Sequence, residues 1–283
     1  MPDWSKQPSV EGRLTFIGGE VDGPAEFRAA PEHPPEHLPY VDRMVSIHDA
    51  SGVADQLSLD REGVILADLD DSRPDYDDPE ELRRIWVPAV QAMLKRETGA
   101  SHVFSWAIGR RYSTSLPQSQ RRGETAAARM VHSDFAPGAV GMTVDNRPVA
   151  EVIADMVGDA RPRRWRAYNV WQATSPPPHD MPLAFCDCSS ARAEDFVTAR
   201  GRSTYENGQA FDFEVSWVKY AQRQSWLYFR DLRPDQAIIF CGLDLEVGAM
   251  AHRVAHTAFR HPDVPADAPP RASVEIRNIV VWG

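Results

Sequence analysis

The chain has few cysteines and no long apolar run. Only Cys186, Cys188 and Cys241 occur among its 283 residues, and an odd, small number without a secretory signal predicts free, buried thiols. A membrane-spanning helix needs about 18 or more consecutive apolar residues, which the sequence does not contain. The first residues also lack the basic and apolar regions of a signal peptide. These absences predict a cytoplasmic protein with no membrane span.

Basic residues are also outnumbered by acidic residues. Lys and Arg number 31 against 41 Asp and Glu, which gives a formal net charge of −10. Because binding to a phosphate backbone needs clustered cations, this balance argues against a nucleic-acid partner. The basic stretches at 121–122 and 161–166 are short and are expected to be solvated. With 42% hydrophobic and 25% charged residues, the composition is that of a soluble globular protein with a substantial core.

The first 100 residues are expected to wrap the core with extended segments and one helix. From Asp78 onward, apolar residues recur at intervals of three and four, which predicts an amphipathic helix over 78–98. Asp78 suits the cap of this helix and Pro79 its first position. Pro88 lies inside the pattern and has no N–H to donate, so we expect a kink or a restart there.

Residues 101–283 consist mainly of strand-length segments separated by turns. Many short strands with Pro and Gly turns favour a sandwich or a jelly roll. The expected strands are 101–108, 128–135, 164–171, 182–186, 211–218, 224–229, 236–240, 254–259 and 272–282. A short helix is expected over 147–156 and a mobile loop over 110–125. The predicted fold is mainly β with flanking helices, in a single domain spanning 1–283.

Two His-x-Asp triplets offer a pair of metal ligands. A histidine and a carboxylate two residues apart on a strand point to the same face, so one metal ion can bind both. His132-Ser133-Asp134 lies inside an apolar-flanked strand, whereas the proline of His261-Pro262-Asp263 begins a loop and breaks the alternation. About one such triplet is expected by chance in a chain of this composition. The strand context favours the first copy.

The third ligand is expected to be a histidine on a late strand. His256 alternates with Val254 and Ala258 on one face and is preferred, while His252 is the competitor. Two imidazoles and one carboxylate with open positions are typical of non-haem Fe(II) oxygenases.

A candidate grip for an anion begins the last strand. Arg271 and Ser273 share one face, where a planar guanidinium and a hydroxyl can bind a carboxylate. Oxygenases that use 2-oxoglutarate need such a grip on its distal carboxylate while the keto acid end chelates iron. Arg277 lies on the same face and is the alternative anchor.

Six short motifs, in this order and spacing, resemble one family of non-haem iron oxygenases. That family includes the hydroxylase component of cephamycin 7-methoxylation and fungal secondary-metabolite hydroxylases, desaturases and endoperoxide-forming enzymes. The likeness runs from about residue 100 to the C-terminus, and more loosely before that. The motifs are 132–135, 169–171, 182–187, 226–228, 256–259 and 270–277. One departure concerns the cosubstrate end, because members of the family often have a glutamate where Ala272 stands.

The resemblance implies a fold, a cofactor set and a site. It implies a double-stranded β-helix core, a cupin-like jelly roll, over 101–283. Fe(II) would be bound by His132, Asp134 and His256, and 2-oxoglutarate by Arg271. Together with O₂, these would oxidise a small molecule of the secondary-metabolite type by ferryl-mediated hydrogen abstraction. The outcome would be hydroxylation, desaturation, cyclisation or peroxidation, and a homodimer is a further expectation.

Other residues receive roles only through this resemblance. Asn169 is expected to help seat the cosubstrate. Phe135, Trp171 and Tyr228 are expected to line the substrate pocket, with the loop 110–125 as its lid.

Two alternatives use the same chain differently. One is another metal-dependent jelly-roll enzyme, a cupin-like isomerase or a zinc hydrolase without 2-oxoglutarate, for which Glu275 and Glu214 are the candidate bases. The other is a binding protein that has kept the fold without catalysis.

Overall fold

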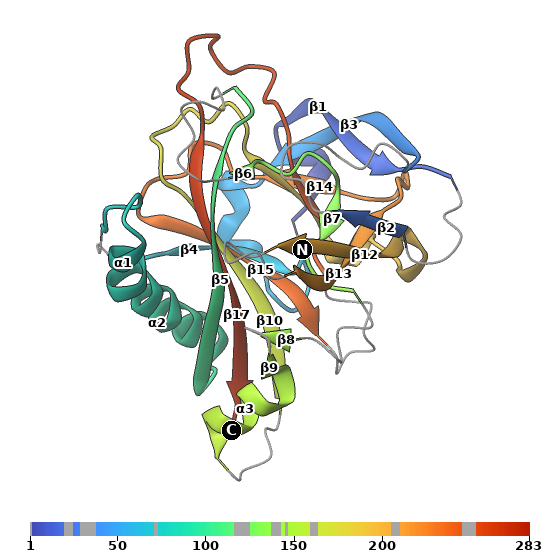
Figure 1. The fold of residues 1–283 in the computed structure, drawn as a ribbon. Helices are drawn as coiled ribbons and strands as arrows, with labels where there is room; N and C mark the ends of the chain where they lie inside the picture. The colour runs from blue at the N-terminus through green and yellow to red at the C-terminus, as the bar shows by residue number, and fades with distance from the viewer. Residues whose placement is uncertain are drawn as a thin grey trace.

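The described part of the chain folds into two large β-sheets with a few flanking helices (Figure 1). The computed structural model describes residues 2–19, 25–28, 38–70, 73–115, 125–136, 143–144, 147–158, 164–204, 210–244 and 253–283. The first sheet contains, in spatial order, β1 (Ser9–Ile17), β3 (Tyr40–Asp49), β14 (Trp226–Tyr228), β11 (Leu183–Cys186), β16 (His256–Ala258), β7 (His132–Ser133), β13 (Ala210–Val218), β12 (Phe196–Thr204) and β2 (Ala25–Arg28). The second contains β4 (Val64–Asp68), β15 (Gln236–Asp244), β10 (Arg164–Ala173), β17 (Ala272–Trp282), β5 (His102–Tyr112) and β6 (Thr125–Ala126).

Short elements complete the described fold. The two-residue strands β8 (Thr143–Val144) and β9 (Arg147–Pro148) pair with each other just before α3 (Val149–Val157). Short 3₁₀ segments occur at Trp4–Lys6, Ser51–Gln56, Cys188–Ser190 and Ala193–Asp195. The helix expected over 147–156 therefore begins two residues later than predicted, because Arg147 and Pro148 pair as a strand.

The long central strands of the second sheet carry residues from far apart in the sequence into one row. β10 pairs with β17 without interruption, from Arg164 opposite Trp282 to Ala173 opposite Ser273. Since paired residues of antiparallel strands point to the same face, Asn169 and Arg277 stand side by side. β5 covers the other edge of β17 and runs to Tyr112, so residues 110–112 are strand, where a loop was expected.

The first sheet holds the shortest strands at its centre. The strand expected over 128–135 is reduced to His132–Ser133, which lies between β16 and β13. Residues 127–131 belong to no named strand, and Met130 forms an isolated bridge with Thr15. The register places His256 of β16 directly opposite His132 of β7.

The predicted helix forms, and its interruption falls where expected. Asp78 accepts a hydrogen bond from the Glu80 backbone N–H, and Pro79 begins α1 (Pro79–Glu81). A π-helical turn over Leu82–Trp86 then precedes α2 (Val87–Thr98), whose second residue is Pro88. The wider turn accommodates the missing proline donor without ending the helix.

The helix packs on the outer face of the second sheet. Its buried side chains join the main core cluster, and the Trp86 indole donates to the Gln172 side chain of β10 at 2.6 Å. Gln172 alternates with Trp171, so the helix covers the face opposite the row that contains Asn169 and Arg277. The row that contains Asn169 and Arg277 therefore faces the first sheet, with which it can form a site.

Segments before residue 101 contribute strands to both sheets. β1 and β3 form one edge of the first sheet and β2 the other, while β4 is an edge of the second. The fold is mainly β with flanking helices, arranged as a jelly roll, as the sequence predicted. All three cysteines are free and buried. Within the described ranges, no helix has both the length and the apolar character needed to cross a membrane.

Candidate metal centre

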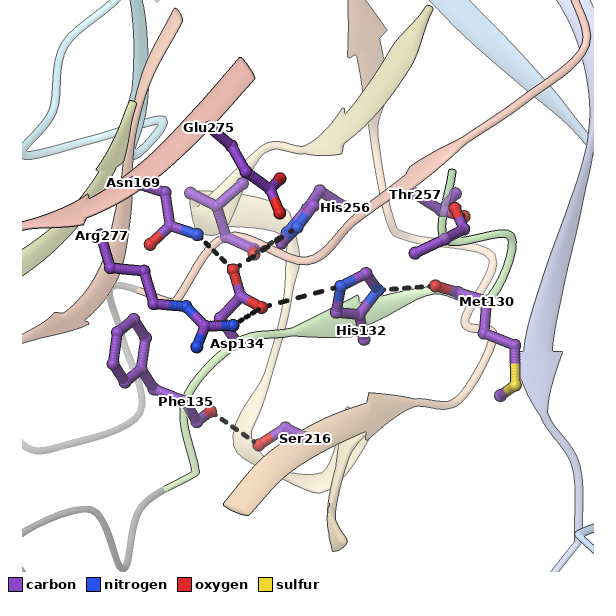
Figure 2. Close-up of polar contacts among 12 residues, drawn as sticks. Met130, His132, Asp134, Phe135, Asn169, Ser216, His256, Thr257, Glu275 and Arg277 are labelled. Carbon is purple, nitrogen blue, oxygen red and sulfur yellow. Dashed lines mark hydrogen bonds and ion pairs between the residues drawn. The ribbon is translucent and has the colours of Figure 1, made fainter. Parts of the chain in front are cut away.

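His132, Asp134 and His256 lie together in the space between the two sheets (Figure 2). Alternation along the β7 segment puts His132 and Asp134 on one face, with 3.9 Å between Nε2 and Oδ1. His256 reaches the same point from β16, with 3.9 Å between its Nε2 and Asp134 Oδ2. One ligand atom from each residue lies within 4.8 Å of the others. This arrangement can hold one metal ion by two nitrogens and a carboxylate.

Backbone carbonyls orient both imidazoles toward the carboxylate. His132 Nδ1 lies 2.7 Å from the Met130 carbonyl oxygen, and His256 Nδ1 lies 3.3 Å from that of Val254. A carbonyl oxygen only accepts, so these contacts favour the proton on Nδ1 and leave the Nε2 lone pair for a metal. The His256 ring is further held by Phe240 and Phe185, with centroid separations of 4.7 and 6.3 Å.

The charge states suit a metal site. Burial alone would raise the pKa of Asp134, but Arg277 and the two histidines outweigh it and hold that pKa well below its usual range. Burial, together with the nearby His132, lowers the pKa of His256 to about 4. At neutral pH the carboxylate is therefore ionised and His256 is neutral, the forms that ligate a metal.

Two residues of the second sheet contact the Asp134 carboxylate. Arg277 Nη2 donates to Oδ1 at 2.9 Å, and Asn169 Nδ2 donates to Oδ2. The sequence suggested both residues as cosubstrate contacts. The structure instead brings them to the candidate metal ligand, because Asn169 and Arg277 face each other across β10 and β17. Asn169 Oδ1 is buried and has no hydrogen-bond partner among the described residues.

Arg271 occupies a different position, at the buried start of β17. Only 1% of the residue is exposed. Its Nε donates to the Met181 carbonyl oxygen at 2.8 Å, and its Nη1 donates to the Ser273 hydroxyl. Burial lowers the pKa of Arg271 to about 10, so it is charged at neutral pH. In the described part of the chain, its Nη2 has no hydrogen-bond partner. A buried guanidinium with a free N–H can receive an anion.

The Ser273 hydroxyl holds this guanidinium in place. It accepts from Arg271 and lies 3.4 Å from the Arg111 carbonyl oxygen, to which it can donate. Glu275, the next residue on this face, pairs with Arg111 at 2.9 Å, and its carboxylate points toward His256 (Figure 2). Glu214, the other base considered, pairs with Arg200 on the neighbouring strand β12.

The three aromatic residues expected to line the substrate pocket lie in three different environments. Phe135 follows Asp134 and packs in a cluster with α3. Trp171 lies beneath Arg271, whose guanidinium carbon is 5.3 Å from its ring centroid. Tyr228 is turned away from the ligand cluster: Leu227 stands beside Phe185 in register, so Tyr228 faces the opposite side of the sheet.

The remaining sequence candidates lie outside the cluster. The Tyr228 hydroxyl contacts His261 Nε2 at 3.1 Å, and His261 Nδ1 accepts a hydrogen bond from the Asp263 backbone N–H. The hydrogen bonds of the second His-x-Asp triplet therefore stabilise its own loop. His252 and residues 116–124 of the expected lid fall outside the described residues. Ser113 and Ser115, before that segment, donate to the buried Asp180 at 2.7 and 2.6 Å.

Sequence reasoning did not find Asp180. Its Oδ1 accepts from the Arg271 backbone N–H at 2.9 Å, so one carboxylate ties the start of β17 to the end of β5. No spacing pattern in the sequence links these three segments, since the contact arises from loop geometry. Phe185 and Phe240 lie on strands β11 and β15, and they were missed because their contacts with His256 depend on how distant strands pack.

Known proteins resemble this chain over most of its length. A family model described as an oxidoreductase/YMDC permease-like domain matches residues 14–281. The alpha-ketoglutarate-dependent dioxygenase phiK of a fungal species is 31% identical, with 79% of each chain covered. The Fe(II)/2-oxoglutarate-dependent dioxygenase nvfI of Aspergillus novofumigatus is 29% identical and covers 84% of this chain and 83% of its own. The solved structure of the iron and alpha-ketoglutarate-dependent endoperoxidase NvfI has a TM-score of 0.78 at 26% identity, covering 97% of this chain and 98% of that one. Every residue of the cluster described above lies inside the range that the family model matches.

Proposed function

We propose an iron site and a cosubstrate site for this chain, which belongs to the oxidoreductase/YMDC permease-like family and, with its relatives, to the Fe(II)- and 2-oxoglutarate-dependent dioxygenases. In this proposal His132, Asp134 and His256 bind the iron. Arg271 binds 2-oxoglutarate. The enzyme uses Fe(II), 2-oxoglutarate and O₂ to oxidise a small molecule of the secondary-metabolite type.

The observation that carries the iron assignment is the shared orientation of the three ligands. Both Nε2 atoms lie 3.9 Å from an Asp134 oxygen, and both Nδ1 atoms point to backbone carbonyls. Histidines of a metal site commonly use their second nitrogen in this way. The donor set fits Fe(II), and two imidazoles and one carboxylate leave coordination positions for a keto acid and O₂.

The burial of Arg271 supports its assignment to the cosubstrate. Its unpaired Nη2 offers a charge-assisted hydrogen bond to the distal carboxylate, and Ser273 and Met181 fix the guanidinium plane. Arg277, the alternative anchor, already donates to Asp134. We therefore assign Arg277 and Asn169 to holding the ionised carboxylate in its orientation.

When bound, the iron and the keto acid supply the oxidising power for attack on a C–H bond. The residues of this chain bind, orient and exclude water. The buried rings of Phe185 and Phe240 hold His256 and keep it dry. Phe135, adjacent to Asp134, is proposed as a substrate contact. Trp171 is proposed as the floor beneath Arg271, and Tyr228 receives no role in the site.

An anaerobic absorption experiment tests the assignment. Fe(II) and 2-oxoglutarate are expected to produce the weak visible charge-transfer band of a chelated keto acid in the native protein and none in His132→Ala. Arg271→Lys is expected to need far more 2-oxoglutarate to reach the same band, with Fe(II) binding retained. Arg277→Lys is expected to weaken Fe(II) binding itself. A normal 2-oxoglutarate requirement in Arg271→Lys, with a raised one in Arg277→Lys, would transfer the anchor to Arg277.

Three broader expectations remain predictions. A single folding domain is tested by whether thermal unfolding is one cooperative transition. A homodimer is tested by light scattering after size exclusion. A cytoplasmic location is tested by fractionating cells that produce the protein.

A further inference from the structure

Arg253 is a buried charge that the assignments above do not use. It is 1% exposed and lies three residues before His256. Burial lowers the pKa of its guanidinium to about 10, so the group stays charged at neutral pH. Burying a charge is destabilising unless hydrogen bonds or other groups compensate. Its contacts therefore indicate what this position requires.

The contacts of Arg253 join three separate segments. Its Nη1 donates to the Ser216 hydroxyl of β13 at 2.8 Å and lies 3.4 Å from the Phe135 carbonyl oxygen. The Ser216 hydroxyl donates to the same carbonyl at 3.1 Å (Figure 2). The Arg253 guanidinium carbon lies 4.5 Å from the ring centroid of Phe196, at the start of β12. One side chain thus connects the segment leading to His256 with the residue that follows Asp134.

The sheet alone does not hold all three candidate ligands. His132 and His256 are opposite each other in the β7–β16 register, so their separation is set by strand pairing. The pairing of β7 with β13 ends at Ser133, opposite Ser216. Asp134 and Phe135 follow that last pair, where the chain leaves the strand. The backbone that carries the carboxylate therefore depends on contacts other than the ladder.

We propose that Arg253 is a positioning residue for the metal centre, acting through the Phe135 carbonyl and the Ser216 hydroxyl to hold the backbone of Asp134 against the two histidines. The inference rests on the proposed iron site. Arg277 and Asn169 hold the Asp134 carboxylate, so removal of the Arg253 donor loosens the backbone that carries it, and the ordering that metal binding then requires reduces affinity. Groups that orient metal ligands typically contribute between about tenfold and a hundredfold in metal affinity.

Metal binding by the purified protein tests this proposal without turnover. Mn(II), which does not oxidise in air at neutral pH as Fe(II) does, serves as the probe, and its Kd is measured by calorimetric titration. Arg253→Met keeps the length of the side chain but removes the donors, and we expect its Kd to rise on the order of tenfold. Arg253→Lys restores one donor and is expected to recover part of the loss. Ser216→Ala is a smaller change that tests the same bridge if Arg253→Met does not fold.

Arg166→Met is the matched control. Arg166 is also a buried arginine, 4% exposed, and it bonds Asp244, Asp60 and the Tyr168 hydroxyl. It is three positions from Asn169 on a regular strand and so faces away from the site. Its loss is expected to lower the melting temperature while leaving the Kd for Mn(II) unchanged.

The outcomes separate the two proposals. Absence of Mn(II) binding by the native protein would overturn the iron site and this inference with it. A native-like Kd in Arg253→Met, or in Ser216→Ala where that variant carries the test, would overturn the inference alone. An equal rise in Kd for Arg253→Met and Arg166→Met would also overturn it, because general destabilisation would then explain both.

Discussion

The guanidinium of Arg271 lies over the indole of Trp171, with 5.3 Å between the guanidinium carbon and the ring centroid. Both residues are 1% exposed. The pairing offsets part of the cost of burying a cation while leaving one N–H of that cation free for an anion. This relationship places Trp171 beside the proposed anchor of the cosubstrate, whereas the sequence suggested that it would line the substrate pocket.

Replacement of Trp171 by leucine is expected to weaken 2-oxoglutarate binding. A cation–π contact contributes about 0.5–2 kcal/mol, which corresponds to a rise in Kd of roughly twofold to thirtyfold. The measurement is a titration of the Fe(II)-loaded protein with 2-oxoglutarate under anaerobic conditions. Trp171→Phe, which keeps an aromatic face, should lose less. Equal losses in the two variants would show that packing volume, and not the ring, supports Arg271.

Replacement of Gly242 by alanine is expected to disturb the Asp134 segment from the opposite sheet. The register of β10 with β15 shifts at this glycine, which is the extra residue of a bulge. A methyl group there would overlap the Phe135 ring, and Phe135 follows the candidate ligand. Overpacking of this kind costs about 1–3 kcal/mol, and we also expect a raised Kd for Mn(II).

Gly52→Ala is the control for that substitution. A Cβ at Gly52 has no neighbour within 4 Å in the described structure, so its effect on the free energy of unfolding should stay within about 0.5 kcal/mol. Urea denaturation measures both variants. Gly242→Ala with native stability and native metal affinity would contradict the packing argument.

The stability of the metal-free protein is expected to fall as the pH decreases from 7.5 to 5. His256 has a pKa of about 4 in the folded protein and about 6.5 when unfolded. Below about pH 6.5 the unfolded chain takes up a proton that the folded protein does not, so unfolding becomes easier. The contribution of His256 amounts to about 2 kcal/mol by pH 5. Asp134 is ionised in both states over this range and adds little.

Urea denaturation with a chelator present, at several pH values, measures this effect. His256→Gln should show a shallower loss of stability, because that variant lacks the titrating group while the other histidines remain. Identical pH dependence in the two proteins would mean that His256 is not buried as a neutral imidazole.

Local patterns in the sequence were sufficient for several parts of this protein. The caps at Asp78 and Pro79 and the position of Pro88 predicted the helix and its interruption, since these are effects of neighbouring backbone atoms. Alternation placed His132 and Asp134 on one face, because a strand repeats every two residues. The small, odd number of cysteines predicted free thiols in the same local way, and all three are free and buried.

Only the tertiary structure decided which of these faces meet. The pairing of β10 with β17 put Arg277 and Asn169 on Asp134, and the pairing of β11 with β14 turned Tyr228 away from the site. Arg253 reaches the Phe135 carbonyl from a segment more than a hundred residues later. Alternation determines the face a residue takes within its own strand, whereas register between distant strands depends on the packing of the whole core. For that reason the sequence determined the kinds of ligand this protein presents, and the fold determined which residues hold them in place.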